Sequence, residues 1–432
     1  MTVIGLDDTD SRERGMCTTF VAHRIASALE REGDGVERLL LVRLNPAVKH
    51  KTRGNAALAI HLAEDTAPEA AFDIARGVIE RCAETADDRT NPGLVVAPHV
   101  AEQVPEAVAS FAPEAITDHH SIEDAVSLAD STGYRHWGRG NGRGRIGALA
   151  AIGAWEALED WTYETIAYRE ESRWGTPRAV DAESVRVAAD TAYPTVWDTI
   201  DRGEDETVCV PHTPGPILHG IRGDDSEATK RVSSAIESEP VAERRTFVTN
   251  QGTDGHLRHA DTLVEGRAYR LDGTVVTAPE TRRGGHVFFD LEIGLEVGDG
   301  PHEESKTVAC AAFEPTKRFR DRVRALRPGD RLTVCGELSR GTVKLEKFAV
   351  RRLVTTERVT PLCPDCDRTM ESAGRGQGYR CRDCKTSTAE KSSRPLERDL
   401  EVGWYEVPPC ARRHIAKPLV RGGFDAPVHP ER

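Results

Sequence analysis

The sequence has little lysine, few aromatic residues and no long apolar run. Lysine supplies 10 of the 58 basic residues, aromatic residues make up 5% of the chain, and 71 acidic residues bring the net charge to −13. No apolar stretch approaches the length that crosses a bilayer, and Asp7 and Asp8 end the first apolar stretch before it could serve as a secretory signal. We therefore expect a cytoplasmic protein without membrane-spanning segments.

The negative charge is unevenly distributed along the chain. Residues 361–432 carry 13 Lys and Arg against 11 Asp and Glu, so the acidic excess lies in the preceding residues. An acidic, lysine-poor body is typical of a salt-rich cytoplasm, where ions screen its self-repulsion. The net charge therefore does not exclude a nucleic-acid partner.

The cysteines show a metal-binding pattern rather than a disulfide framework. Six of the ten are scattered, and the other four form two CxxC pairs with 14 residues between them. This spacing suits one tetrahedral Zn²⁺, and four thiolates leave no position for a catalytic water. The sequence predicts a structural zinc ribbon held by Cys363, Cys366, Cys381 and Cys384.

An acidic triplet, Asp7, Asp8 and Asp10, follows the short apolar stretch Val3 to Leu6 in "VIGLDDTD". The apolar stretch reads as a buried strand, and a helix is expected from Thr19 to Leu29. Three carboxylates so close repel one another unless a cation holds them, and Mg²⁺ prefers carboxylate oxygens together with phosphates. The triplet therefore indicates a magnesium and nucleotide-phosphate site, with solvated turn residues as the alternative.

Apolar strands and helices alternate through the first 260 residues, which indicates α/β and α+β units. We place an α/β domain at 1–140 and a ferredoxin-like domain at 141–262. Expected elements are strands at 38–44, 56–62, 207–210 and 245–249, and helices at 70–82, 148–158 and 227–236. Histidines 212 and 219 fall in an expected loop, and Asp254 follows the last of these strands.

Two loops rich in glycine and arginine suggest phosphate contacts. "RLNPAVKHKTRGN" is a cationic loop that precedes an expected strand, and "GRGRIG", residues 142–147, runs directly into an expected helix. Glycines let a backbone approach a phosphate, and a helix N-terminus supplies N–H donors. We therefore take Gly142 and Gly144 as phosphate-binding, with Arg139 and Arg143 contacting phosphate or RNA; a glycine linker between domains is the alternative.

Residues 263–355 change to a strand pattern. Five expected strands, with a helix near 316–326 between the third and fourth, match the layout of an OB-fold barrel, which binds oligonucleotides. One member of the pair Phe288 and Phe289 is expected to be exposed for base stacking. Residues 356–432 are expected to hold the zinc ribbon and a C-terminal tRNA-binding segment.

The chain resembles the archaeal tRNA-isoleucine agmatidine synthetases, which are 2-agmatinylcytidine synthetases. The resemblance runs along the whole chain. It is carried by the blocks "GLDDTDSRERGMCTTF", "RLNPAVKHKTRGNAA", "GRGRIGALAAIGA", "GGHVFF", "CAAFEPTKRFR", "MESAGRGQGYRC" and "WYEVPPCARRH". It implies a kinase-like first domain and an ATP-dependent ligase that attaches agmatine to carbon 2 of the wobble cytidine in the CAU anticodon of a minor isoleucine tRNA, so that AUA is read instead of AUG.

The resemblance also implies roles for individual residues. ATP, Mg²⁺, agmatine and the tRNA are the expected ligands, with Asp7, Asp8 and Asp10 on magnesium and Thr18 as a phosphate ligand or transient phosphoryl acceptor. "SRERGM" carries an extra residue or two after Asp10, which affects where Thr18 lies. The implied phosphate- or base-clamping residues are Lys49, Lys51, Arg53 and Asn55. Agmatine is a dication, and Asp254 is a candidate partner for its guanidinium.

Two other functions fit parts of the sequence. A non-catalytic RNA-binding factor would use the barrel and the ribbon but would leave the N-terminal carboxylates unexplained. A magnesium-dependent aspartyl phosphotransferase would use the "DDTD" stretch but has no need of a zinc ribbon. Nucleotide consumption separates the first alternative from the ligase.

Overall fold

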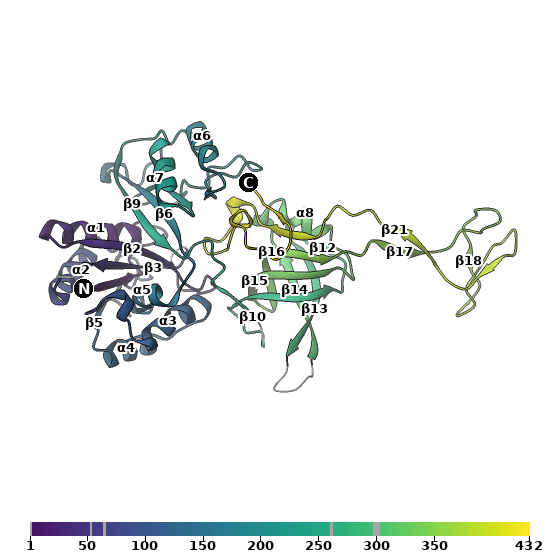
Figure 1. Ribbon diagram of the computed structural model, residues 1–432, viewed down its shortest axis with the longest axis horizontal. Coiled ribbons are helices and arrows are strands. Elements are labelled where there is room, and N and C mark those ends of the chain that lie inside the picture. Colours follow the sequence, from purple (N-terminus) through teal and green to yellow (C-terminus); the bar gives the residue numbers. More distant parts are fainter. Residues whose placement is uncertain (1, 52–53, 64–65, 260–261, 297–302) are drawn as a thin grey trace.

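The computed structural model describes residues 2–432 except 52–53, 64–65, 260–261 and 297–302. Three bodies follow one another along its long axis: an α/β body, a β-barrel and a small ribbon carried on a narrow stalk (Figure 1). No helix in the described part of the chain is both long and apolar enough to cross a membrane.

One nine-stranded sheet runs through the whole α/β body in the order β5-β4-β1-β3-β2-β9-β6-β8-β7. Its strands are β1 (Val3–Asp7), β2 (Val36–Arg43), β3 (Ala56–Leu62), β4 (Gly93–Ala97), β5 (Arg135–Gly138), β6 (Thr162–Arg169), β7 (Val196–Trp197), β8 (Ile217–Gly223) and β9 (Val241–Thr249). The parallel pair β2–β9 joins the strands of the first 140 residues to those that follow. The two expected α/β units therefore share one sheet.

Helices cover both faces of this sheet. They are α1 (Thr18–Glu32), α2 (Pro68–Cys82), α3 (Glu106–Thr117), α4 (Ile122–Ser131), α5 (Gly144–Ala157), α6 (Ala182–Ala192) and α7 (Ser226–Ala235). Helices α1 and α2 form one apolar core with the sheet, and α3, α4 and α5 form another on the opposite face. The central strand β1 is buried because both faces are covered, which explains its unbroken apolar run.

The second half of this sheet has its own regular order. Strands β9, β6, β8 and β7 lie side by side, with α6 between β6 and β7 in the chain and α7 between β8 and β9. The sequence missed β8, because His219 and Arg222 interrupt its apolar pattern, although His219 bonds Ser233 and Arg222 lies beside Asp198. The expected strand at 207–210 is wrong: this stretch forms turns.

Five strands close the barrel, as the sequence predicted. They are β11 (Ala268–Val275), β13 (Val287–Glu296), β14 (Glu303–Ala312), β15 (Arg331–Ser339) and β16 (Thr342–Arg352). Helix α8 (Phe319–Arg324) lies between the third and fourth strands and packs Phe319 and Val323 into the barrel core. Phe289 is buried and Phe288 is half-buried, in accordance with their alternation.

Short elements complete the chain. They are β10 (Leu257–His259), β12 (Glu280–Thr281), β17 (Thr356–Val359), β18 (Glu371–Ser372), β19 (Tyr379–Arg380), β20 (Ser387–Thr388), β21 (Ser392–Pro395), β22 (Gly403–Glu406), β23 (Val428–His429) and 3-10 turns at 101–103, 171–173, 314–316, 409–411 and 419–421. Strands β17 and β21 pair to form the stalk, and β18–β20 form the ribbon at its end (Figure 1).

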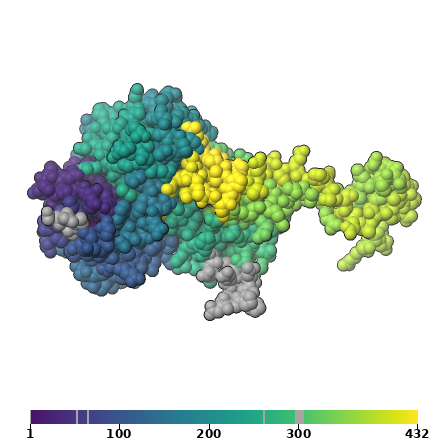
Figure 2. All heavy atoms as spheres, in the orientation of Figure 1, coloured from purple at the N-terminus to yellow at the C-terminus, as the bar shows by residue number. Residues whose placement is uncertain are grey.

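The C-terminal residues return from the ribbon to the two larger bodies. Strand β22 pairs with β16 of the barrel. Beyond it, the buried Arg412 forms an ion pair with Asp198, and Arg421 pairs with Asp160 and Asp224 at 3.0 and 2.6 Å. In Figure 2 these yellow residues fill the junction between the α/β body and the barrel. The segment therefore fixes the two bodies to each other.

Candidate active site

The acidic triplet lies where β1 ends. Asp7 is the last residue of the strand, and Asp8 turns the chain with a positive φ of 58°. The backbone N–H of Asp8 donates to Asp7 Oδ1 at 2.6 Å, and Asp8 Oδ2 accepts from the Asn91 N–H at 3.0 Å and from Arg143 Nε at 2.8 Å. The first two carboxylates are therefore held rigidly beside each other.

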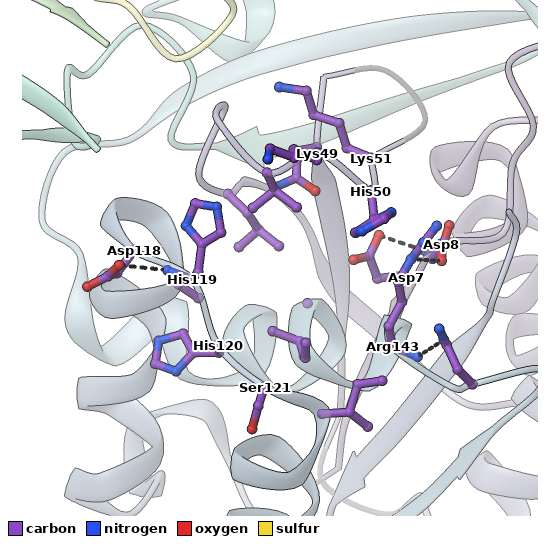
Figure 3. A pocket seen from close by; sticks show the side chains of 18 of the residues that line it. Asp7, Asp8, Lys49, His50, Lys51, Asp118, His119, His120, Ser121 and Arg143 are labelled. Carbon is purple, nitrogen blue, oxygen red and sulfur yellow. Dashed lines mark hydrogen bonds and ion pairs between the residues drawn. The ribbon is translucent and has the colours of Figure 1, made fainter. Parts of the chain in front are cut away.

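Asp7 and Asp8 border a cavity of about 600 Å³. On the opposite side lie His119, His120 and Ser121 from the loop between α3 and α4, as Figure 3 shows. The remaining boundary includes Lys49, His50, Lys51, Asn55, Asn141 and Arg143. Acidic, cationic and imidazole groups thus surround one space beside the end of a buried strand.

Burial controls the charge of the two carboxylates. It raises the pKa of Asp7 well above its usual value, and the neighbouring charge of Asp8 raises it further. Burial also raises the pKa of Asp8, although the Arg143 guanidinium opposes this effect. The two ionised carboxylates need more positive charge than Arg143 supplies, which a bound cation would provide.

Magnesium fits the pair Asp7 and Asp8, and the charge of Asp10 acts on both of these carboxylates. The ion usually takes one or two protein carboxylates and completes its shell with water and phosphate oxygens. Asp7 and Asp8 offer such a set at the first cavity, whereas Asp10 lines a different cavity. Among the described residues, the four ribbon cysteines are the one group of three or more His, Cys, Asp or Glu residues whose ligand atoms all lie within 4.8 Å of one another.

The glycines of "GRGRIG" allow α5 to pack closely against the sheet. A Cβ at Gly144 would lie 2.6 Å from the Asp7 carbonyl oxygen, and a Cβ at Gly147 would overlap the Asp7 carboxylate. Gly142 turns the chain with a φ of 67°. Gly142 lies against the Arg145 side chain and Gly144 lies behind Asp7. We expected both to bind phosphate, and neither is among the residues that line the two cavities.

A second cavity, of about 440 Å³, lies beyond Asn55 and Ala56, which border both. Asp10 and Thr18 face it, and Thr18 accepts a hydrogen bond from Thr9 Oγ1 at 3.1 Å. Its other walls come from β6, β8, the 206–213 turns and the C-terminal segment. The structure therefore divides the predicted catalytic residues between two adjoining cavities.

A buried ionic network supports the second cavity. Arg43 Nη2 donates to Gln251 Oε1 at 3.0 Å, and Gln251 Nε2 donates to Glu164 Oε2 at 2.5 Å. On another side the buried Arg412 pairs with Asp198 and, at 2.8 Å, with Glu406. Burial lowers the pKa of Arg43, and it also lowers the pKa of His414 well below its usual value, which keeps this imidazole neutral.

The structure places the remaining predicted residues as follows. Lys49, Lys51 and Asn55 line the first cavity, whereas the side chain of Arg139 is exposed outside it. Arg53 lies outside the described residues. Asp254 lies away from both cavities and accepts hydrogen bonds from the buried Lys347 ammonium at 2.9 and 2.7 Å. Its carboxylate is therefore already paired with a cation of the barrel.

The four ribbon cysteines form a compact cluster. Their sulfur atoms lie within 4.8 Å of one another, although the residues come from two turns far apart in the sequence. This arrangement fits the tetrahedral thiolate set that the sequence predicted for Zn²⁺. The ribbon that carries these cysteines lies at the end of the stalk, on the side of the barrel away from the α/β body (Figure 1).

Sequence reasoning missed several residues that border the cavities. "DHHS", residues 118–121, is a polar run between two helices, and its adjacent histidines were the one available signal. Glu164 and Arg222 carry no local motif, and His414 lies in the block "WYEVPPCARRH", which assigned it no role; folding brings the three together from distant parts of the chain.

Three family models match the chain: the TiaS TCKD domain over residues 3–141, the TiaS FLD domain over 142–256 and the TiaS C-terminal zinc ribbon domain over 360–400. A curated relative from Haloquadratum walsbyi, a TiaS named as the 2-agmatinylcytidine synthetase of an isoleucine tRNA, is 55% identical, and the alignment covers 100% of both chains. The chain belongs to the TiaS family.

Solved TiaS structures are similar over the whole length. A crystal structure of TiaS in complex with its isoleucine tRNA and ATP aligns with a TM-score of 0.87 at 41% identity, covering 100% of this chain and 99% of the other. A crystal structure of TiaS with the same tRNA, AMPCPP and agmatine aligns with a TM-score of 0.86 at 39% identity and the same coverage. The predicted family is therefore confirmed, and with it a mixed α/β architecture with a five-stranded barrel and a zinc ribbon.

Proposed function

We propose that the chain is an ATP-dependent ligase that attaches agmatine to carbon 2 of the wobble cytidine in the CAU anticodon of a minor isoleucine tRNA. Membership of the TiaS family over the full length supports this function. The observation that carries it at the site is the meeting of two cavities, one beside the buried Asp7 and Asp8 and one beside Asp10 and Thr18. Activation by ATP and attack by an amine need adjoining but separate spaces.

The reaction requires the carbon-2 oxygen to become a leaving group. A carbonyl oxygen leaves poorly, so phosphoryl transfer from ATP to this oxygen precedes attack. The primary amine of agmatine then adds to carbon 2, and the oxygen departs with the phosphate. The product is 2-agmatinylcytidine, and the anticodon then reads AUA instead of AUG.

The first cavity suits the ATP phosphates. Lys49, Lys51 and Arg143 provide positive charge there, and Asn55 joins this space to the second cavity. Asp7 and Asp8 would hold a magnesium ion that neutralises charge developing on the transferred phosphoryl group. The base must leave the anticodon stack to reach this site.

The second cavity suits the cytidine base and agmatine. A guanidinium pairs best with a carboxylate, and Asp10, Glu164 and Glu206 border this cavity. Since Asp254 lines neither cavity, we assign agmatine to the carboxylates of the second cavity instead.

We further propose that Thr18 is a phosphate ligand or a transient phosphoryl acceptor. Its hydroxyl lies at the start of α1, on the same cavity as Asp10, with Thr19 beside it. Thr18→Ala should abolish agmatine transfer, and Thr18→Ser should restore part of it. Full turnover by Thr18→Ala would reject this role.

The same proposal covers the parts of the fold. We take residues 1–140 as a kinase-like catalytic domain and 141–262 as a ferredoxin-like domain, which the strand order β9-β6-β8-β7 supports. Residues 263–355 form an OB-fold, and 356–432 hold the zinc ribbon and the returning C-terminal segment. The zinc ion has a structural role. Because the chain modifies tRNA and uses ATP, we place it in the cytoplasm.

The test is a direct assay of the product. The chain is incubated with ATP, Mg²⁺, agmatine and a CAU-anticodon isoleucine tRNA transcript at high salt. The tRNA is then digested, and the masses of its nucleosides are measured by mass spectrometry. We expect a cytidine heavier by agmatine less water, and no such product with Asp8→Ala. Unmodified cytidine in tRNA that still binds would favour an RNA-binding factor, and ATP consumption without agmatine transfer would favour an aspartyl phosphotransferase.

A further inference from the structure

A third hollow, of about 380 Å³, connects the two cavities to the barrel. We call it the basic cleft. Its lining comes from the loop before β3, from β15 and β16 of the barrel, and from the C-terminal segment. Lys49 and Lys51 line both the basic cleft and the first cavity, and His414 lines both the cleft and the second cavity. A molecule lying in the cleft would therefore reach the edge of both cavities.

Positive charge dominates the basic cleft. Lys49, Lys51, Lys344 and Arg413 face it, together with the carboxylate of Glu337. Glu337 is already engaged by Arg413 at 2.5 Å and by Lys344 at 3.4 Å. No salt bridge joins Lys49 or Lys51 to another residue that the structure describes. The cleft therefore has an unneutralised cationic side that faces the cavities.

The surroundings of Lys51 destabilise the charged form of its side chain. Burial, together with the nearby charge of Arg413, lowers its pKa to about 8. An anion between these two side chains would remove this penalty. The side chain of Lys344 is 37% exposed and that of Arg413 is 29% exposed, so both can reach a ligand that enters from the surface.

We propose that the basic cleft binds a backbone phosphate of the RNA strand next to the reacting nucleotide, between Lys51, Lys344 and Arg413. This inference rests on the proposed function, because it concerns the same substrate. A nucleotide that enters the second cavity remains attached to its neighbours, whose phosphates must lie close to the cavity mouth. Lys344 on β16 makes the barrel part of this binding site. The site is therefore built from the loop before β3, the barrel and the C-terminal segment.

The RNA backbone fits the cleft better than ATP does. Its phosphate would bind at the open junction with the barrel, whereas the ATP phosphates are assigned beside Asp7 and Asp8. Lys344 lines the cleft and neither of the two larger cavities. A contact to RNA phosphate changes affinity for every sequence and weakens as salt rises.

The test compares Lys344→Ala with Lys306→Ala, which removes an exposed lysine from another barrel strand. We expect Lys344→Ala to raise KM for tRNA about tenfold, to leave KM for ATP unchanged and to lower the slope of log Kd against log salt by about 0.7. Lys344→Arg should restore both values, and Lys306→Ala should behave as wild type. A raised KM for ATP with unchanged KM for tRNA would assign the cleft to the nucleotide and overturn the proposal.

A neutral methylphosphonate placed at each linkage beside the wobble cytidine gives a second test. We expect one such linkage to weaken tRNA binding to the wild-type chain about tenfold and to weaken binding to Lys344→Ala by less, because the variant has already lost one of the contacts that the neutral linkage removes. Additive losses at every linkage would overturn the proposal. Wild-type product formation, measured in parallel, reports on the proposed function separately.

Discussion

Single residues at the end of β1 set the chemistry of the first cavity. Asp7 and Asp8 are held beside each other, with Arg143 paired to Asp8. Such a pair is unfavourable in the absence of ligand, and a cation together with phosphate relieves it. The repulsion between Asp7 and Asp8 therefore destabilises the fold locally, at the position where the proposed reaction needs carboxylates to hold a magnesium ion.

Replacing Asp7 should separate stability from activity. Asp7→Asn removes a buried charge that Asp8 repels, so we expect a higher Tm without ligands. The same change removes a proposed magnesium ligand, so agmatine transfer should fall by about 100-fold or more. Calorimetry and the nucleoside assay measure both effects. A lowered Tm of Asp7→Asn would contradict the view that repulsion between Asp7 and Asp8 destabilises the protein.

Lys51 should make RNA binding depend on pH. Its pKa of about 8 means that it is charged at pH 7 and neutral at pH 9, in a surrounding of Arg413, Glu337, Arg12 and Lys344. We therefore expect tRNA affinity at constant salt to fall at least about threefold between pH 7 and pH 9. Bound phosphate would shift the midpoint upward from 8. Lys51→Arg should flatten the profile, whereas an unchanged profile would remove Lys51 from the phosphate contact.

The residues that line the cavities were predictable from the sequence only where one short stretch contained them. The acidic residues after β1 and the lysines of the 46–55 loop could be selected because strand end and charge pattern lie within a few residues. Asp254 looked equally suitable, yet its partner Lys347 is 93 residues away, and no local pattern reveals that pairing.

At the scale of elements, α5 is the helix that positions the site. It packs against β1 so closely that a Cβ at Gly5 would overlap the Ala148 carbonyl oxygen, and a Cβ at Gly147 would overlap Asp7. The glycines of "GRGRIG" therefore serve helix–strand contact, so that the helix backs the carboxylates.

Adding one methyl group at this contact should destabilise the protein. Gly5→Ala forces β1 and α5 apart, and we expect the free energy of unfolding to fall by about 1–3 kcal/mol, with loss of activity. Gly77→Ala is the matched control, since its Cβ would meet only the end of the Arg81 side chain and α2 gains helix propensity. Denaturant unfolding of both variants measures the difference. Equal stability of Gly5→Ala and wild type would show that the contact relaxes without cost.

Elements with a clean apolar period were predictable, and those with buried polar residues were not. The strand at 56–62 and the helix ending at Cys82 were found because their apolar residues recur regularly. Strand β8 was missed because His219 and Arg222 are satisfied by residues on other elements. The turns at 207–210 had a strand-like composition, but they line the second cavity instead.

At the scale of the whole molecule, the zinc ribbon is set apart from the catalytic body. The two-stranded stalk carries it away from the barrel, and the chain returns along this stalk to the larger bodies (Figure 1). A change confined to the ribbon should therefore affect how tRNA is held and leave the two cavities intact.

Removing zinc should test that separation. Metal analysis should find one zinc per wild-type chain and none in Cys363→Ser, because three thiolates hold the ion poorly. We expect a raised KM for tRNA, an unchanged KM for ATP and an unchanged unfolding transition of the α/β body. Cys82→Ser, which changes a half-buried cysteine on α2, should keep its zinc. Loss of ATP binding by Cys363→Ser would show that the ribbon supports the catalytic body.

The second cavity is closed by residues that lie far apart in the sequence. Its walls include Asp10 and Thr18 near the start, and Arg412 and His414 near residue 432. During translation the early residues leave the ribosome long before the late ones, so a nascent chain has its carboxylates but no closed pocket for the base. A chain that stops before Arg412 would lack this wall, so we expect it to bind nucleotide yet leave tRNA unmodified.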